Sequence, residues 1–383
     1  MQVRQFTSTD GRFPDAELAK LATINAQLIL CFADPAFFTN GAAEVRSLAQ
    51  RFPQATVLGC SSAGEISSAG VTVGRAVVTA VHFADPGLLA ISEPLASMAD
   101  SEAAGSRIGA ALVPTRPHTV IVLGQGVELN GSALIRGLRK ELGASVALVG
   151  GLAGDAGKFE RTFVISGDQV SADRVVALAF NSPKLRIAHG CFGGWRPFGP
   201  VRRVTRSTGN ILNELDGEPA VAVYRRYLGA QSVQLPAAAL FFPFSMLDDQ
   251  LKESGVTRTI LGMDESTGSI TLAGEVVENG HLRLMCANAD DLINGAEVAA
   301  EGAALDSTDR ELPSLALLVS CVGRRLALGA RTEEEVEAVS SVLGEHCMLT
   351  GFYSNGEISS FGDSPENQLH NQTMTVTRFI EEP

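Results

Sequence analysis

This chain has few cysteines, six among 383 residues, and they form no CxxC pair. Structural zinc sites and disulfide frameworks need closely spaced cysteines, so the sequence predicts neither. Long apolar runs are also missing, because stretches such as Ser314–Val322 are far shorter than the roughly 18 residues that span a bilayer. The N-terminal residues lack the apolar core of a signal peptide. We therefore expect a reduced, cytoplasmic protein that does not associate with membranes.

Positive charge is scarce as well. The chain has 30 lysines and arginines against 43 acidic residues, a formal net charge of -13. Such a surface repels phosphate backbones, so nucleic acid is excluded as an expected partner. Hydrophobic residues make up 45% of the chain and charged residues 19%, which is typical of a folded protein and not of a disordered one. The length favours two domains.

A twelve-residue phrase occurs twice, near opposite ends of the chain. GCSSAGEISSAG at Gly59–Gly70 aligns with GFYSNGEISSFG at Gly351–Gly362, and eight of the twelve positions agree. Each copy follows an apolar run, a helical pattern and a second apolar run. The same order recurs from Val120 to the glycine-rich turn GGLAGD at Gly150–Asp155, which indicates a third copy. Short β-branched runs that alternate with helices predict parallel βαβ units with right-handed crossovers.

Other segments favour antiparallel pairing. Arg161–Ser166 and Arg174–Ala179 flank a polar turn as the strands of a hairpin would. The predicted fold is therefore α/β, with duplicated βαβ units, mixed parallel and antiparallel sheets, and two modules packed together. A turn followed by a helix near Ala220–Leu228 places the predicted domain boundary between residues 218 and 219. Farther on, Thr332 with Glu335 three residues later predicts a capping box at a helix N-terminus.

Several of these phrases resemble the FIST family. The matching segments occur in the order of an N-terminal FIST module (1–218) followed by a C-terminal one (219–383), and cover about Ala26 to Gly362. They are GCSSAGEI, GGLAGD, AHGCFGGWRPFGP (Ala188–Pro200), Val204–Gly229 and GFYSNGEISSFG. The resemblance implies a non-enzymatic, intracellular bacterial sensory protein that binds a small ligand in signal transduction. For one subgroup it implies haem b, nitric oxide sensing and control of a separate histidine kinase in a two-component system.

Two glutamates occupy the same position in the two phrases. Glu65 and Glu357 each follow a glycine, which permits a backbone turn that a side chain would obstruct. Each carboxylate could tie down its loop by accepting backbone N–H groups, or accept hydrogen bonds from a ligand. We expect the two turns to converge on one cavity. The predicted ligand-binding residues are Ser62, Gly64, Glu65, Tyr353, Ser354, Gly356, Glu357 and Trp195.

His189 is the candidate axial ligand for a haem. It begins a segment rich in glycine and aromatic residues, including Trp195, which could admit a flat apolar group. Cys191, Cys60 and Tyr353 are competing axial ligands. The alternative is structural, with His189 bonded to a neighbouring backbone group and Trp195 in the core.

A second hypothesis is that the protein is a hydrolase or transferase whose nucleophile is Ser61 or Cys60 at the GCSSAGE turn. The nucleophile elbow is G-x-S-x-G, whereas this turn has Ala63 at the last position and the second copy has Tyr353 in place of Ser61. We therefore expect a sensor without catalytic residues. The alternatives are a hydrolase or transferase that uses Ser61 or Cys60, and an adaptor protein without a ligand pocket.

Overall fold

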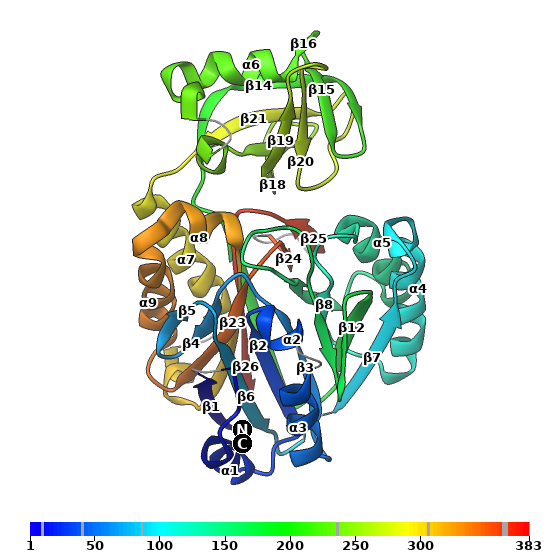
Figure 1. The fold of residues 1–383 in the computed structure, drawn as a ribbon, viewed down its shortest axis with the longest axis vertical. Coiled ribbons are helices and arrows are strands. Elements are labelled where there is room, and N and C mark those ends of the chain that lie inside the picture. Colours follow the sequence, from blue (N-terminus) through cyan, green and yellow to red (C-terminus); the bar gives the residue numbers. More distant parts are fainter. Residues whose placement is uncertain are drawn as a thin grey trace.

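The computed structural model consists of a large body and a smaller lobe, with both chain termini at the end of the body far from the lobe (Figure 1). It describes residues 1–8, 11–39, 42–85, 87–234, 237–304, 307–361 and 367–382. Gly362, the last position of the second phrase, lies outside the described residues. None of the described helices has the length and hydropathy that crossing a membrane requires.

The body contains three six-stranded sheets with one common plan. In each sheet the two strands of a βαβ unit pair in parallel, two antiparallel strands extend one side, and an antiparallel hairpin extends the other. The first sheet has the order β1 (Gln2–Ser8), β6 (Ala76–His82), β2 (Leu28–Ala33), β3 (Thr56–Ser61), β10 (Val164–Ser166), β11 (Gln169–Ser171). The second has the order β7 (Leu88–Pro94), β12 (Arg174–Phe180), β8 (Thr119–Gly124), β9 (Ala147–Leu152), β24 (Gly356–Ser360), β25 (Asn367–His370). The third has the order β13 (Leu185–Phe192), β26 (Met374–Glu381), β22 (Ser314–Cys321), β23 (Cys347–Ser354), β4 (Glu65–Ser67), β5 (Gly70–Thr72).

The hairpin at the edge of each sheet comes from a different unit. The hairpin after the first phrase, β4–β5, pairs with β23 of the third unit. The hairpin after the second phrase, β24–β25, pairs with β9 of the middle unit, and β10–β11 from the middle unit pairs with β3 of the first. The three units thus exchange hairpins in a closed cycle. The duplicated units and the mixed sheets that the sequence predicted are confirmed.

The turns that end the three central strands meet one another. Three equivalent backbone hydrogen bonds join them in a ring: Ala63 N–H to Tyr353 O at 2.8 Å, Gly154 N–H to Ser61 O at 2.9 Å, and Asn355 N–H to Leu152 O at 3.1 Å. Each turn donates to one neighbour and accepts from the other, so the approximate threefold repeat extends to the backbone at its centre. The two glycine–glutamate turns are therefore neighbours in space, and the GGLAGD turn is the third member of the ring.

Strand residues alternate between two apolar environments. In β2, Leu28, Leu30 and Phe32 join a core shared by all three sheets, whereas Ile29 and Cys31 face the helices of the first unit. Phe32 stacks on Phe352 across the shared core with ring centroids 4.8 Å apart. Helices cover the outer faces of the sheets, so central strands such as β2, β8 and β22 are buried on both sides. These are α1 (Asp15–Ala22), α2 (Ala36–Thr39), α3 (Ala43–Arg51), α4 (Ser101–Leu112), α5 (Gly131–Leu142), α7 (Ala289–Ala303), α8 (Val322–Leu328) and α9 (Thr332–Leu343).

The small lobe is inserted into the third unit between β13 and α7. An eight-stranded antiparallel sheet and one helix form most of it. Its elements are β14 (Arg196–Thr208), β15 (Ile211–Leu215), β16 (Glu218–Pro219), α6 (Ala220–Leu228), β17 (Phe244–Leu247), β18 (Glu253–Arg258), β19 (Ile260–Asp264), β20 (Ser269–Leu272) and β21 (His281–Cys286). The predicted boundary between residues 218 and 219 falls inside this sheet, within β16, which pairs with β15. In space the chain divides instead into the body and the inserted lobe.

Candidate ligand-binding site

Glu65 and Glu357 have equivalent surroundings and are both buried, with 1% and 0% of their surface exposed. The serine three residues earlier donates to each carboxylate, from Ser62 Oγ at 2.5 Å and from Ser354 Oγ at 2.6 Å. The second carboxylate oxygen accepts a backbone N–H just before the last strand of the unit, from Arg75 at 3.1 Å and from Thr373 at 3.3 Å. Each glutamate thus fastens its turn to the following strand, which supports the structural alternative.

Burial raises the pKa of both carboxyl groups. The pKa of Glu65 rises to about 7 and that of Glu357 to about 8, although the serine hydroxyls and backbone N–H groups oppose the rise. The preceding glycines are needed for different reasons. Gly64 has a φ of 140°, and a Cβ there would lie 3.0 Å from the Tyr353 ring, whereas a Cβ on Gly356 would lie 3.1 Å from Leu369. Close packing leaves no room for a ligand at these two positions.

Tyr353 is fully buried, and its hydroxyl donates to Glu335 Oε1 at 2.6 Å. Burial, reinforced by the Glu335 charge, raises the pKa of the phenol well above its usual value. The hydroxyl therefore serves an internal hydrogen bond.

The segment around His189 does not fit a haem as the structure arranges it. The Nε2 atom of His189 lies 2.6 Å from Ser360 Oγ, and burial lowers the pKa of the imidazole. A Cβ on the neighbouring Gly190 would lie 2.1 Å from the carbonyl oxygen of Ala299, so this glycine lets β13 pack against α7 and leaves no slot. Trp195 Nε1 donates to the carbonyl oxygen of Gln372 at 2.8 Å.

The competing axial ligands are more deeply buried than His189. Cys191, Cys60 and Tyr353 are all buried, and burial raises the pKa of the Cys191 thiol to about 12 and that of Cys60 well above its usual value. In the part of the chain that the structure describes, no group of three or more His, Cys, Asp or Glu side chains could hold a metal ion.

Ser61 and Cys60 lack the setting of a nucleophile. Ser61 Oγ donates to the carbonyl oxygen of Gly154 at 2.7 Å and accepts the Phe163 N–H at 2.9 Å, so both bonds go to backbone and connect neighbouring turns. Both residues have no exposed surface. A nucleophile needs an adjacent base and access to substrate, and this hydroxyl has neither among the described residues.

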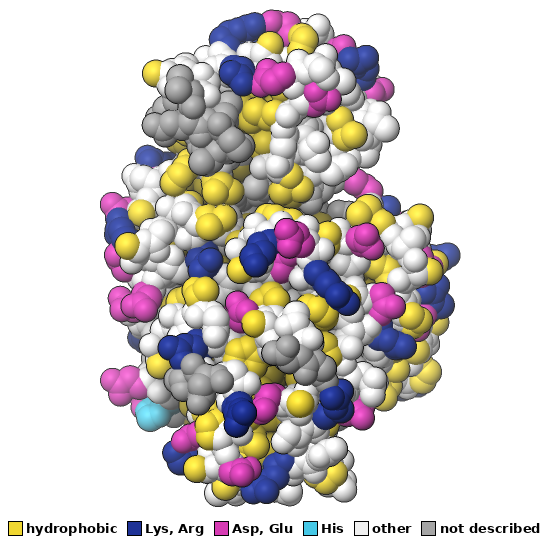
Figure 2. All heavy atoms as spheres, in the orientation of Figure 1, with side chains coloured by type: hydrophobic (Ala, Val, Ile, Leu, Met, Phe, Trp, Pro, Cys, Tyr) yellow, Lys and Arg dark blue, Asp and Glu magenta, His cyan; other side chains and the backbone are white. Residues whose placement is uncertain are grey.

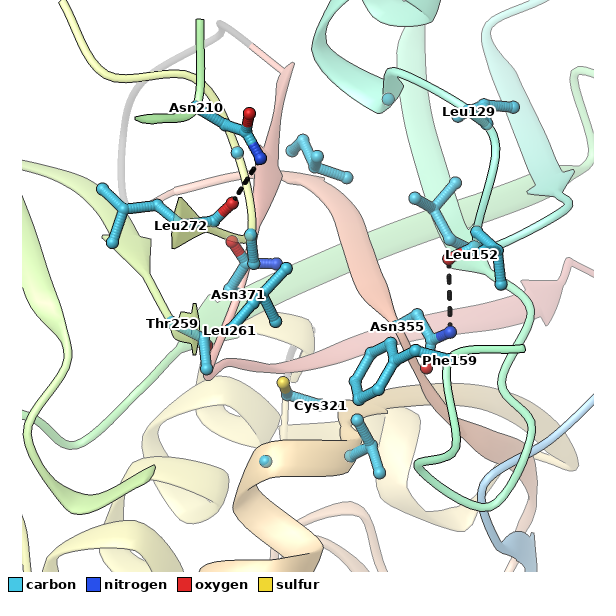
Figure 3. A pocket seen from close by; sticks show the side chains of 18 of the residues that line it. Leu129, Leu152, Phe159, Asn210, Thr259, Leu261, Leu272, Cys321, Asn355 and Asn371 are labelled. Atoms are coloured by element: carbon cyan, nitrogen blue, oxygen red, sulfur yellow. Dashed lines mark hydrogen bonds between the residues drawn. The ribbon is translucent and has the colours of Figure 1, made fainter. Parts of the chain in front are cut away.

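A cavity of about 1020 Å³ lies between the small lobe and the body. The small lobe contributes Thr259 and Leu261, the middle unit contributes Phe159, and the third unit contributes Asn355 and Asn371 (Figure 3). The volume is at the upper end of the range for pockets that bind drug-sized molecules, roughly 300–1,000 Å³. Such pockets form preferentially where two structural units meet.

The residues predicted to bind ligand do not line this cavity. All of them lie in the described part of the chain, and none contributes to its walls: Ser62, Gly64, Glu65, Tyr353, Ser354, Gly356, Glu357, Trp195 and His189. Asn355 of the second phrase does line it, at the position where the first phrase has Ala63. A polar residue that breaks the repeat was the signal in the sequence that could have indicated it.

Three polar atoms in the cavity wall lack hydrogen-bond partners. They are Thr259 Oγ1, Asn355 Oδ1 and Asn371 Oδ1, each shielded from solvent. Buried polar groups in folded proteins almost always have a partner, because an unpaired one costs roughly 1–3 kcal/mol. Three such atoms around one apolar cavity make it the candidate ligand-binding site of the described chain.

The mouth of the cavity is apolar on both sides. Met98, Phe159, Leu261 and Leu326 line it, and between 42% and 49% of each of these residues is exposed. Figure 2 shows hydrophobic side chains gathered along the boundary between the small lobe and the body. Clustered exposed apolar side chains mark binding surfaces, whereas scattered ones are ordinary.

The family model of the FIST N domain matches residues 27–218, just over half of the chain. The family model of the FIST C domain matches residues 220–360. The chain belongs to the FIST family. FIST domains are sensory domains of signal transduction. The boundary between the two FIST matches, at residues 218–220, therefore lies inside the small lobe. It does not coincide with the division of the folded chain into lobe and body.

Two similar proteins give less information about this chain than the family match does. A stretch of 85 residues of this FIST chain, 22% of its length, is 34% identical to uncharacterized protein MJ1623 of Methanocaldococcus jannaschii, and spans only 16% of that protein. Cyanuric acid hydrolase from A. caulinodans aligns with 100% of this chain and 98% of its own, at 10% identity and a TM-score of 0.40. A likeness of that size carries no conclusion about activity.

Proposed function

We propose that this FIST protein is a non-enzymatic sensor that binds a small organic molecule in the cavity between its lobes. The observation that carries the proposal is the cavity itself, with apolar walls, an apolar mouth and three unpaired polar atoms inside. Six cysteines without a disulfide are consistent with action in a reducing cytoplasm.

The position of the cavity suggests how binding is transmitted. The small lobe joins the body through two chain segments, one before β14 and one after β21. Polar contacts span the junction, among them those of Glu275 with Asn130 Nδ2 at 2.8 Å and with Arg136 Nη1 at 3.3 Å. A ligand that contacts both sides would favour one arrangement of the lobes, and a separate signalling protein would read that change.

A haem-based nitric oxide sensor is the narrower version of this function. The His189 imidazole bonded to Ser360 and the packed glycine beside it do not support that version, so we propose an organic ligand instead. A histidine kinase remains our proposed type of partner. Added haemin should give no Soret band that depends on His189, which spectra of the parent and of His189→Ala would test.

The binding test uses Nile red, a neutral apolar dye whose fluorescence rises in apolar sites. We expect saturable binding at one site. Leu261→Trp should block the mouth and weaken binding at least about tenfold. Val277→Trp is the matched control, because Val277 is 72% exposed on the same lobe and does not line the cavity. No binding, or equal binding by both variants, would refute the proposed site.

A further inference from the structure

We infer that the ligand is a neutral molecule with a cyclic amide edge, –CO–NH–, which pairs with the side-chain carboxamide of Asn371. This inference rests on the proposed function and specifies the ligand class of the same cavity. It follows from the hydrogen-bonding capacity that the folded chain leaves unused there.

Asn371 lies between β25 and β26 and is only 1% exposed. Neither end of its carboxamide bonds to any residue that the structure describes, whereas each neighbouring side chain makes at least one hydrogen bond, although Gln372 Oε1 is also unpaired. His370 lies within hydrogen-bonding distance of the carbonyl oxygens of Gly255 and Ser359, and Gln372 Nε2 donates to the carbonyl oxygen of Leu240. A free carboxamide presents a donor and an acceptor side by side, and its direct complement is another amide in the cis form.

Asn355 sets a second requirement. Its Nδ2 donates to the carbonyl oxygen of Gly126 at 3.2 Å, and a carbonyl can only accept. This bond fixes the orientation of the side chain, so the unpaired atom is the oxygen Oδ1. The ligand must therefore present a further N–H or O–H group to this oxygen. Figure 3 shows Asn355 beside Phe159 in the view, with Asn371 and Thr259 across the cavity from it.

The charges around the cavity favour a neutral ligand. Glu275 is already bonded to Asn130 and Arg136, so it has no unmet need for a cation. Lys158 is an exposed residue of the wall. A charged group placed deeper would lose its water without gaining an ionic partner among the described residues, at a cost far above that of a paired amide.

The test compares closely related bicyclic compounds as competitors of Nile red. The probes are 2-quinolone, which has a cyclic amide N–H, N-methyl-2-quinolone, which lacks it, and quinoline-2-carboxylate, which is charged. We expect 2-quinolone to displace the dye with a Kd at least about tenfold lower than that of either other compound. Asn371→Leu keeps the approximate size of the side chain and should abolish this preference, with displacement by each compound measured against the variant's own Nile red affinity.

Asn355→Ala introduces the residue that the first repeat carries at this position, so the turn should be retained. It should weaken 2-quinolone binding relative to the variant's own Nile red affinity. If Asn371→Leu does not fold, Asn371→Ala serves for the same comparison. Equal displacement by 2-quinolone and its N-methyl form, or a preference that persists in both Asn371 variants, would overturn the inference while the cavity remains a binding site. Absence of Nile red binding would instead refute the proposed function.

Discussion

Arg324 and Glu335 face each other inside the third unit, with guanidinium Nη2 2.9 Å from carboxylate Oε2 and neither side chain exposed. The remaining arginine donors reach the carbonyl oxygens of Gly193 at 2.6 Å and Leu292 at 2.7 Å. The second carboxylate oxygen accepts the Tyr353 hydroxyl. The pair thus joins α8, α9 and α7 to the segment that leads into the small lobe. A buried ion pair is tolerated only where such additional bonds satisfy both partners.

Tyr353→Phe separates this structural role from the ligand-binding role that the sequence predicted. The variant loses one hydrogen bond to a buried carboxylate, so we expect a decrease of about 1–3 kcal/mol in the free energy of unfolding. Nile red affinity should not change, because Tyr353 does not line the cavity. Urea unfolding and dye titration measure the two effects. Weaker dye binding at unchanged stability would show that the residue belongs to the site.

The buried glutamates predict a pH dependence of stability. Because the pKa values of Glu65 and Glu357 in the folded state, about 7 and about 8, exceed the usual value near 4.3, the folded chain holds protons that the unfolded chain has released. The free energy of unfolding therefore falls as pH rises from about 5 to 8. Glu65→Gln and Glu357→Gln should each remove part of this fall, on the order of 2 kcal/mol per site.

Urea unfolding at pH 5.5 and 8.5 measures that difference. Glutamine suits both sites, since its NH₂ group can donate to the serine hydroxyl while its oxygen accepts the backbone N–H. Glu218→Gln is the control, because Glu218 lies on the small lobe and pairs with Arg226 at the surface. A pH slope that both glutamine variants share with the parent would contradict the assigned pKa shifts.

The repeat is the part of the fold that the sequence predicts well. The phrase at Gly59–Gly70, its partner near the C-terminus and the turn at Gly150–Asp155 are local signals, and each marks the end of a buried parallel strand as expected. The exchange of hairpins could not be predicted, because pairing between units depends on contacts remote in sequence. The predicted hairpin of Arg161–Ser166 with Arg174–Ala179 is accordingly wrong. β10 pairs with β11, and β12 joins the second sheet.

Burial explains the errors at the site. Thr332 and Glu335 have the spacing of a capping box, yet Thr332 is the first residue of α9 and Glu335 turns inward to Arg324. A local pattern cannot show that a carboxylate has a buried partner elsewhere. For the same reason the cavity was missed. Asn371 belongs to no motif, and its importance lies in the absence of a described hydrogen-bond partner, which only the folded chain reveals.

Three equivalent glycines test the threefold repeat. A Cβ on Gly59, Gly150 or Gly351 would lie 1.8–2.2 Å from a carbonyl oxygen of the adjacent parallel strand, at Cys31, Val122 or Leu318 respectively. The neighbouring backbone cannot move aside as a flexible side chain can. Alanine at each position should therefore lower the free energy of unfolding by about 3 kcal/mol or more. Gly262→Ala is the control, because nothing lies within 4 Å of a Cβ there. Comparable midpoints of urea unfolding for Gly59→Ala and Gly262→Ala would contradict the close approach.

The junction between the lobes should depend on Arg258. This arginine of the small lobe is 6% exposed and donates to the carbonyl oxygen of Leu369 in the body at 3.0 Å, and to that of Glu275 at 3.1 Å. Its burial lowers the pKa of the guanidinium to about 10. Arg258→Met keeps an apolar stem of similar length and removes the hydrogen bond to Leu369 across the junction.

In that variant we expect backbone amides of β18 and β25 to exchange with deuterium about tenfold faster, because the two strands lose a direct link. Amides of β8 and β22, in the shared core of the body, should keep their rates. Arg226→Met is the matched control, since Arg226 pairs with Glu218 at the surface of the small lobe. A uniform increase throughout the chain would indicate general destabilisation. Unchanged rates in β18 and β25 would show that Arg258 does not hold the lobes together, and the route proposed for transmitting ligand binding would then need another contact.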